Sequence, residues 1–178
     1  MKIWPFIFTL LISVSTQAQS NDECKYFQVI SFIRTNSEFN NQIKDYLILN
    51  KAFKKANFID LHISPWIKFI AITQFKDKIN SDSVGISKDI LTNDRLYFKA
   101  YNFEYFKSSL LEKTTNSNEK TFYLTFSKVI GNTLLVEILN YDNGPQMINH
   151  FGSGVKVLFI FDKFGIIKTT LFNKVVYN

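Results

Sequence analysis

The stretch FYLTFSKVIGNTLLVEI, residues Phe122–Ile138, shows the clearest pattern in the chain. Apolar residues recur at every second position on both sides of a Gly-Asn pair, at Phe122, Leu124, Phe126, Leu134, Val136 and Ile138. Such alternation is typical of strands that bury one face. Gly131-Asn132 between the two runs is typical of a tight turn. We therefore predict a β-hairpin here.

A second hairpin is predicted downstream of the first. Apolar residues again occupy alternate positions from Val155 to Phe161, and Ile166–Tyr177 supplies a return strand. The connecting segment Asp162–Gly165 ends in glycine, as expected of a type I turn. Because consecutive hairpins usually lie side by side, a four-stranded antiparallel meander is the simplest topology for this part of the chain.

The N-terminal half has a helical period instead. Apolar residues at three- and four-residue steps predict helices over Asn21–Thr35 and Ser37–Phe53. Alternation then returns at Phe58–Ile63, which we interpret as a half-buried strand. Helices followed by strands indicate the α+β class, with N-terminal helices packed on a mainly antiparallel sheet and two consecutive C-terminal β-hairpins.

The middle of the chain is less regular. Residues 65–75 fit a short helix beginning at Pro65 or a buried strand, and periodicity does not separate the two. Lys76–Asn93 and Ser108–Lys120 are polar and are interpreted as loops. Arg95–Phe106 is rich in aromatic residues with partial alternation, which favours a strand.

The first residues have the three-part order of a secretory signal peptide. Lys2 is positive, Ile3–Val14 is an apolar run, and a small polar exit follows. We expect cleavage after Ala18, with Ser20 as the alternative position. Residues 1–18 are thus interpreted as a signal peptide and residues 19–178 as a single α+β domain.

This leader predicts an exported protein without a stable membrane anchor. Ile3–Val14 is shorter than the roughly 20 apolar residues that span a bilayer. Cys24 is a poor lipid-attachment site because polar Asn21 and acidic Asp22 and Glu23 precede it. The short leader, the single cysteine and the lack of Asn-x-Ser/Thr sites favour a bacterial periplasm or the extracellular space. We expect the lone thiol to be buried.

Composition argues against two classes of protein. Hydrophobic residues make up 46% of the chain, with only 6 Gly and 3 Pro, so a disordered chain is excluded. The net charge is +6, but the lysines are spread among acids and Arg34 and Arg95 are the only arginines. Since arginine is preferred for phosphate contacts, no nucleic-acid partner is expected.

Histidine and cysteine residues are too few for a recognisable metal or nucleophile motif. His62, His150 and Cys24 lack the spacing of zinc ligands, so no metal and no cofactor is predicted. A Cys–His pair would require proximity in space, and no family-specific residues flank Cys24.

Carboxylates in or beside predicted strands are the other catalytic candidates. Glu104, Glu137, Asp142 and Asp162 qualify by position, and a pair of them could support glycoside hydrolysis. Glu137 occupies the polar phase of its strand, so the simpler expectation is a solvent-facing charge.

The aromatic stretch carries the candidate binding residues. Basic residues interleave with rings between Arg95 and Lys107. Most of these rings are expected to fill the core, but tyrosine tolerates a half-exposed position. Tyr97, Tyr101 and Tyr105 are therefore the predicted ligand- or partner-binding residues, because exposed rings mark binding surfaces.

The leading functional hypothesis is an exported, non-enzymatic binding or interaction domain for a protein or small-molecule ligand. One alternative is a small secreted or periplasmic hydrolase. Another is a toxin–immunity or inhibitor-type protein whose sheet edge pairs with a partner strand. An exposed apolar patch would favour the binding domain, a pocket with converging titratable groups the hydrolase, and an uncovered sheet edge the inhibitor-type protein.

Overall fold

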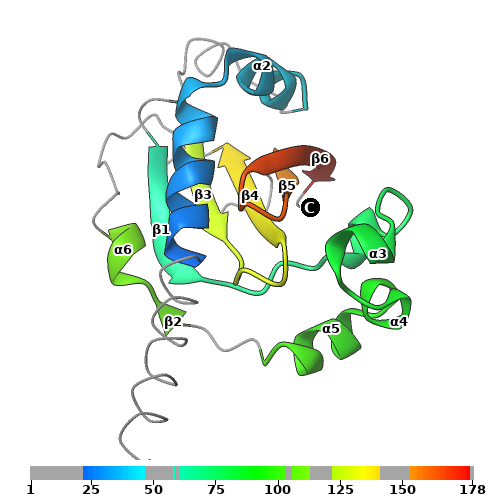
Figure 1. The fold of residues 1–178 in the computed structure, drawn as a ribbon. Coiled ribbons are helices and arrows are strands. Elements are labelled where there is room, and N and C mark those ends of the chain that lie inside the picture. Colours follow the sequence, from blue (N-terminus) through cyan, green and yellow to red (C-terminus); the bar gives the residue numbers. More distant parts are fainter. Residues whose placement is uncertain are drawn as a thin grey trace, which may run out of the picture.

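The computed structural model describes residues 22–46, 58, 61–102, 106–112, 122–140 and 153–176. They form a six-stranded sheet with the order β2-β1-β3-β4-β5-β6. The strands are β1 (Leu61–Ile67), β2 (Phe106–Lys107), β3 (Phe122–Phe126), β4 (Thr133–Asn140), β5 (Ser153–Phe161) and β6 (Ile167–Val176). The helices around this sheet place the protein in the α+β class, as predicted (Figure 1).

The two C-terminal hairpins and the antiparallel meander are confirmed. β3 pairs with β4, β4 with β5 and β5 with β6, all antiparallel. Gly131 and Gly165 close the two hairpin turns with φ of 58° and 79°, in the left-handed region that favours glycine. The predicted alternation determines the faces, since Leu134, Val136 and Ile138 lie in one hydrophobic core and Leu135 in another.

β1 differs from the predicted strand in position and in partner. It covers Leu61–Ile67 rather than Phe58–Ile63, and it passes through Pro65. It runs parallel to β3, with a register irregularity between Ile63 and Ile67, and antiparallel to the short β2. The ambiguous residues 65–75 thus begin as strand and later form the 3-10 turn η2 (Thr73–Phe75).

Two N-terminal helices cover one face of the sheet, as predicted. A helix passes through residues 22–35 and α2 follows at Ser37–Tyr46 (Figure 1). The backbone N–H of Phe39 donates to Asn36 Oδ1 at 2.9 Å, so Asn36 rather than Ser37 caps α2. The Phe32 ring meets both Phe39 and Phe159, with centroids 5.2 and 6.0 Å away, and this joins the helices to β5.

The opposite face is covered by short helices where the sequence predicted a loop and a strand. α3 (Ser81–Val84) and α4 (Lys88–Thr92) interrupt the expected loop, and α5 (Asp94–Ala100) replaces the first part of the expected strand Arg95–Phe106. The strand prediction is wrong for this part because the Asn93 side chain accepts from two amides of the first turn and starts a helix. Residues 103–105 lie outside the described residues, and Phe106 belongs to β2. α6 (Ser109–Glu112) likewise lies in the second predicted loop.

This second layer builds its own core. Tyr97, Phe75 and Leu91 pack with Leu135 and Leu158 of the sheet. Within the described residues, no helix combines the length and apolar character required to cross a bilayer. The predicted leader, residues 1–18 with its two cleavage positions, lies outside the described residues.

Candidate functional site

The structure separates the three predicted tyrosines. Tyr97 is 1% exposed, so the expected half-exposed position is wrong for this residue. Its ring lies inward on α5 and meets that of Tyr101 with centroids 5.5 Å apart. Tyr101 is half-buried at the end of the helix, and Tyr105 lies outside the described residues. A binding role for these tyrosines stays a prediction.

Other hydrophobic residues of the same region reach the surface. Leu96 and Phe98 of α5 and Phe106 of β2 are each 44% exposed, and Trp66 at the end of β1 is 47% exposed. These four form half of the eight exposed large hydrophobic residues among those described. The ring of half-buried Phe69 meets that of Phe98 at 5.3 Å in an edge-on contact. We call these five residues the aromatic rim.

Strand pairing brings β1 and β2 together but places Trp66 and Phe106 on opposite faces of the sheet, because paired residues share a face and successive residues do not. Trp66 pairs with Lys107 and Ile67 pairs with Phe106, so β2 lies against the last residues of β1. Phe69 follows β1 by two residues and contacts α5. The sequence missed Phe98 because the wrong secondary structure gave the wrong side-chain directions. Asn93-Asp94, an N-cap followed by an acid in the first turn, was the available signal.

His62 and Asp162, two candidates within the described residues, lie far apart on the sheet. Register aligns His62 with Tyr123, then with Leu139 and Gly154 on β5. Asp162 is eight residues beyond Gly154, about 27 Å along an extended strand. The His62 ring stacks on Tyr123 at 4.9 Å, and Asp162 Oδ1 accepts from turn amides.

Of the remaining candidates, one is exposed and three lie outside the described residues. Cys24 is exposed, so its predicted burial is wrong. His150, Glu104 and Asp142 lie outside the described residues. Among the residues that the structure describes, no three His, Cys, Asp or Glu side chains gather as metal ligands.

Glu137 belongs to a polar row that crosses four strands. Pairing aligns Thr125, Glu137, Lys156 and Asn173. The Glu137 side chain is only 17% exposed and its Oε1 lies 3.9 Å from Lys156 Nζ. The expected solvent-facing charge is therefore wrong, because residues 69–101 form a second layer over this face of the sheet.

Burial raises the pKa of the Glu137 carboxyl, and attraction to Lys156 and Lys68 opposes the rise. Asn173 Nδ2 extends the row by donating to Gln74 Oε1 at 2.9 Å. Because no second carboxylate belongs to this row, it does not supply the acid pair of a glycoside hydrolase.

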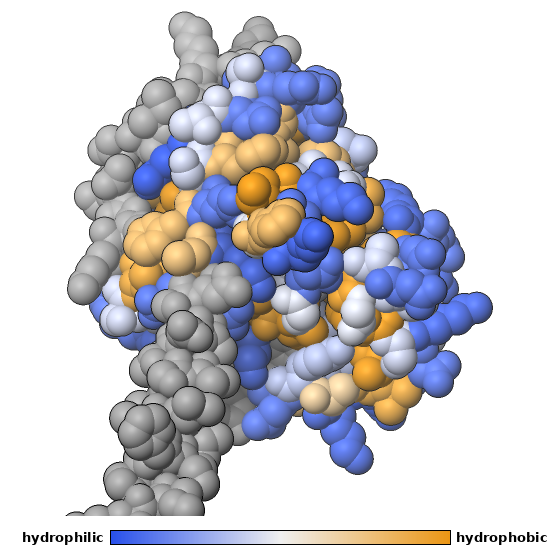
Figure 2. Space-filling view, viewed as in Figure 1, coloured by the Kyte–Doolittle hydropathy of each residue, from blue (hydrophilic) through white to orange (hydrophobic). Residues whose placement is uncertain are grey.

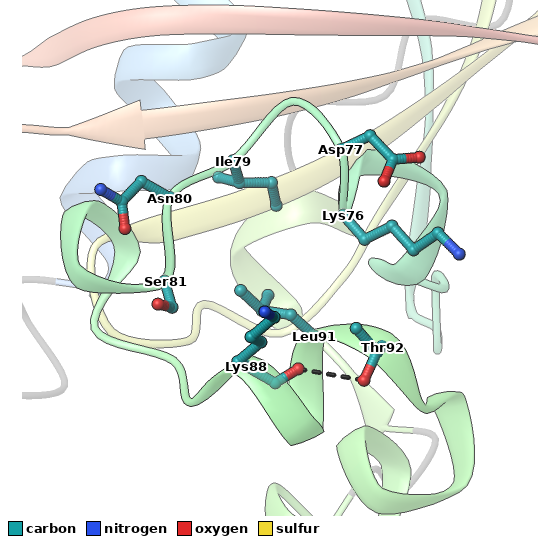
Figure 3. Close-up of a pocket in the computed structure, with 8 residues that line it drawn as sticks. All are labelled: Lys76, Asp77, Ile79, Asn80, Ser81, Lys88, Leu91 and Thr92. Carbon is teal, nitrogen blue, oxygen red and sulfur yellow. Dashed lines mark hydrogen bonds between the residues drawn. The ribbon is translucent and has the colours of Figure 1, made fainter.

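A surface cavity of about 390 Å³ lies between the η2–α3 segment and α4. Its lining includes Lys76, Asp77, Ser81, Lys88 and Leu91 (Figure 3). Figure 3 shows Lys76 and Asp77 extending away from Lys88 and Leu91, so the charged groups are not aimed at one point. This cavity lacks the converging polar groups that mark a ligand site.

β6 is one of the two edge strands of the described sheet, and lysine side chains lie along it. Lys78 Nζ donates to the carbonyl oxygen of Phe172 at 2.7 Å, which occupies one acceptor of the strand. Lys168 and Lys174 are exposed on the same strand. Lysines on an edge strand oppose pairing with another strand, so this edge does not favour the inhibitor-type alternative.

No protein-family model, curated protein or solved structure matches this chain.

Proposed function

We propose that this protein is an exported, non-enzymatic interaction domain that binds a protein partner through the aromatic rim. The observation that carries the proposal is the exposure of four large hydrophobic side chains on β1, β2 and α5, those of Trp66, Leu96, Phe98 and Phe106. Exposing several large apolar side chains is unfavourable in water and is typical of binding surfaces.

Charges beside the aromatic rim define the chemistry of the partner. Arg95 and Lys99 are exposed on α5, next to Leu96 and Phe98. Lys107 of β2 is already paired with Glu112. A partner with an apolar patch bordered by acidic side chains would complement this surface, and its charges would steer the encounter.

Export is the second part of the proposal and rests on the leader. An apolar run after a positive residue, with a small polar exit, supports it. Mass spectrometry of the protein recovered from its host tests it directly. We expect an N-terminus at Gln19 or Asn21, and an intact Met1 in the cytosolic fraction would contradict export.

Cross-linking with envelope proteins of the producing host tests the aromatic rim. The full chain is compared with Leu96→Ser/Phe98→Ser and with Phe27→Ser, a control whose side chain is 47% exposed on the N-terminal helix. We expect one cross-linked species that weakens about tenfold in the rim variant, because burying one large apolar side chain corresponds to at least that factor.

The control variant should keep the cross-link at the level of the unmodified protein. Circular dichroism establishes that both variants are folded. Equal cross-linking by all three proteins, or none by the unmodified one, would refute the aromatic rim as the binding surface.

A further inference from the structure

The turn between β5 and β6 carries the two most exposed large hydrophobic side chains of the described residues. Phe164 is 76% exposed and Ile166 is 57% exposed. Lys163 Nζ lies 5.0 Å from the centroid of the Phe164 ring, and Lys168 is exposed nearby. Figure 2 shows hydrophobic side chains bordered by hydrophilic ones near the centre of the view, where the β5–β6 hairpin lies in Figure 1.

Hydrogen bonds fix the conformation of this turn. Asp162 N donates to Ile166 O at 2.8 Å, and Gly165 N donates to Asp162 O at 3.0 Å. Asp162 Oδ1 accepts from the amides of Phe164 and Ile166 at 2.8 and 2.9 Å. The two apolar side chains are therefore held at the surface by a preorganised backbone, which reduces the entropy lost on docking.

The described chain begins beside the base of the same turn. Asp22 Oδ1 lies 3.6 Å from Lys25 Nζ, and that ammonium lies 5.6 Å from the centroid of Phe161, the last residue of β5. The apolar run Ile3–Val14 ends eight residues before Asp22. Eight residues reach at most about 28 Å, so a bilayer that holds this run lies close to the turn.

We propose that the β5–β6 turn is a membrane-docking tip for bilayers that contain anionic lipids. Phe164 and Ile166 enter the boundary between headgroups and acyl chains, while Lys163 and Lys168 contact lipid phosphates. An apolar side chain beside ammonium groups complements such a bilayer, because its acyl chains are apolar and its headgroup layer is negatively charged. The proposal is independent of the aromatic rim.

A fluorophore placed on the tip tests this inference in the full chain. Phe164→Cys in a Cys24→Ser background is labelled with an environment-sensitive dye and mixed with phosphatidylcholine vesicles, with or without phosphatidylglycerol. We expect emission to rise several-fold with the anionic vesicles and less as salt is added. The same dye at Thr92→Cys, an exposed polar position on α4, should not respond, even if the leader holds the protein on the vesicle.

Substitutions of the tip provide the second readout. Phe164→Ser/Ile166→Ser should lower partition into anionic vesicles about tenfold, since burying one large side chain corresponds to at least that factor. Phe27→Ser is the matched control and should bind as the unmodified protein does. Circular dichroism establishes that each variant is folded.

Two outcomes would overturn the lipid proposal. One is a dye at position 164 that responds to neither kind of vesicle. The other is a response to detergent-solubilised envelope proteins but not to pure lipid, which would make the occupant a protein pocket. Neither outcome affects the cross-linking at the aromatic rim, so the two proposals fail separately.

Discussion

Replacing Tyr97 by alanine is expected to lower the free energy of unfolding by about 4 kcal/mol. The side chain is 1% exposed, and its ring meets those of Phe69 and Tyr101 with centroids 6.0 and 5.5 Å away. Truncating a buried aromatic residue typically costs about 3–5 kcal/mol, and each ring contact adds about 0.5–1.5 kcal/mol beyond buried area. Because Tyr97 makes two such ring contacts, we expect its loss of stability to fall in the middle of the range for buried aromatic residues or above it.

Urea denaturation followed by circular dichroism measures this loss. The midpoint should fall with little change in slope, and the melting temperature should fall by roughly 10 °C. Phe98→Ala in the same helix is the matched control, and its 44% exposed side chain should cost less than about 1 kcal/mol. Equal losses in the two variants would refute the assignment of Tyr97 to the core and revive its role as a surface binding residue.

Three further substitutions test other parts of the fold. Burial raises the pKa of Glu137 in the folded protein, so the unfolded chain loses this proton first as pH rises. The free energy of unfolding therefore falls with rising pH until the folded pKa is passed. Glu137→Gln should lack this fall in urea titrations across acid pH. Asp162→Ala removes the acceptor of two turn amides and should cost about 2 kcal/mol, with faster hydrogen exchange at both amides. Gly131→Ala should destabilise more than Gly85→Ala in thermal melts. Both glycines have positive φ, so placing alanine at either position strains the backbone by about 1–2 kcal/mol. At Gly131, unlike Gly85, the added Cβ would also lie 3.2 Å from the carbonyl oxygen of Val84.

The C-terminal sheet could be predicted because the residues that specify its strands and turns lie close together in the sequence. Alternation along β3, β4 and β5 determines which side chains face each core, and glycines mark the turns at 131 and 165. A tight turn also determines which strands pair. The parallel pairing of β1 with β3 has no such signal, because residues 68–121 intervene and nothing near Ile63 specifies Leu124 as its partner.

The helices over the second face were missed for a different reason. α3, α4 and α5 have 4, 5 and 7 residues, too short to be stable alone, so tertiary packing determines them. The wrong secondary structure also gave wrong side-chain directions for the predicted binding residues. On the helix Tyr97 enters the core, where its ring meets that of Tyr101, and Phe98 reaches the surface.

The burial of Glu137 in the polar row is another feature that the local sequence pattern does not predict. The sequence correctly assigns Glu137 to the face opposite Val136 and Ile138, but not the layer that covers that face. Burial of this carboxylate follows from residues more than 30 positions away. Its pairing with Lys156 depends on the register of β4 and β5, which no tight-turn motif in the sequence between them specifies.

The contacts of the first helix determine when this chain can fold. Tyr26 Oη donates to Ser127 O and Lys25 Nζ donates to Gly131 O, across separations of 101 and 106 residues. During synthesis these two hydrogen bonds cannot form until the β3–β4 hairpin emerges. Contacts so distant in sequence slow folding, because a long loop must close before they form. The ribosome therefore releases most of this chain before the first helix can be fixed against the sheet by these hydrogen bonds.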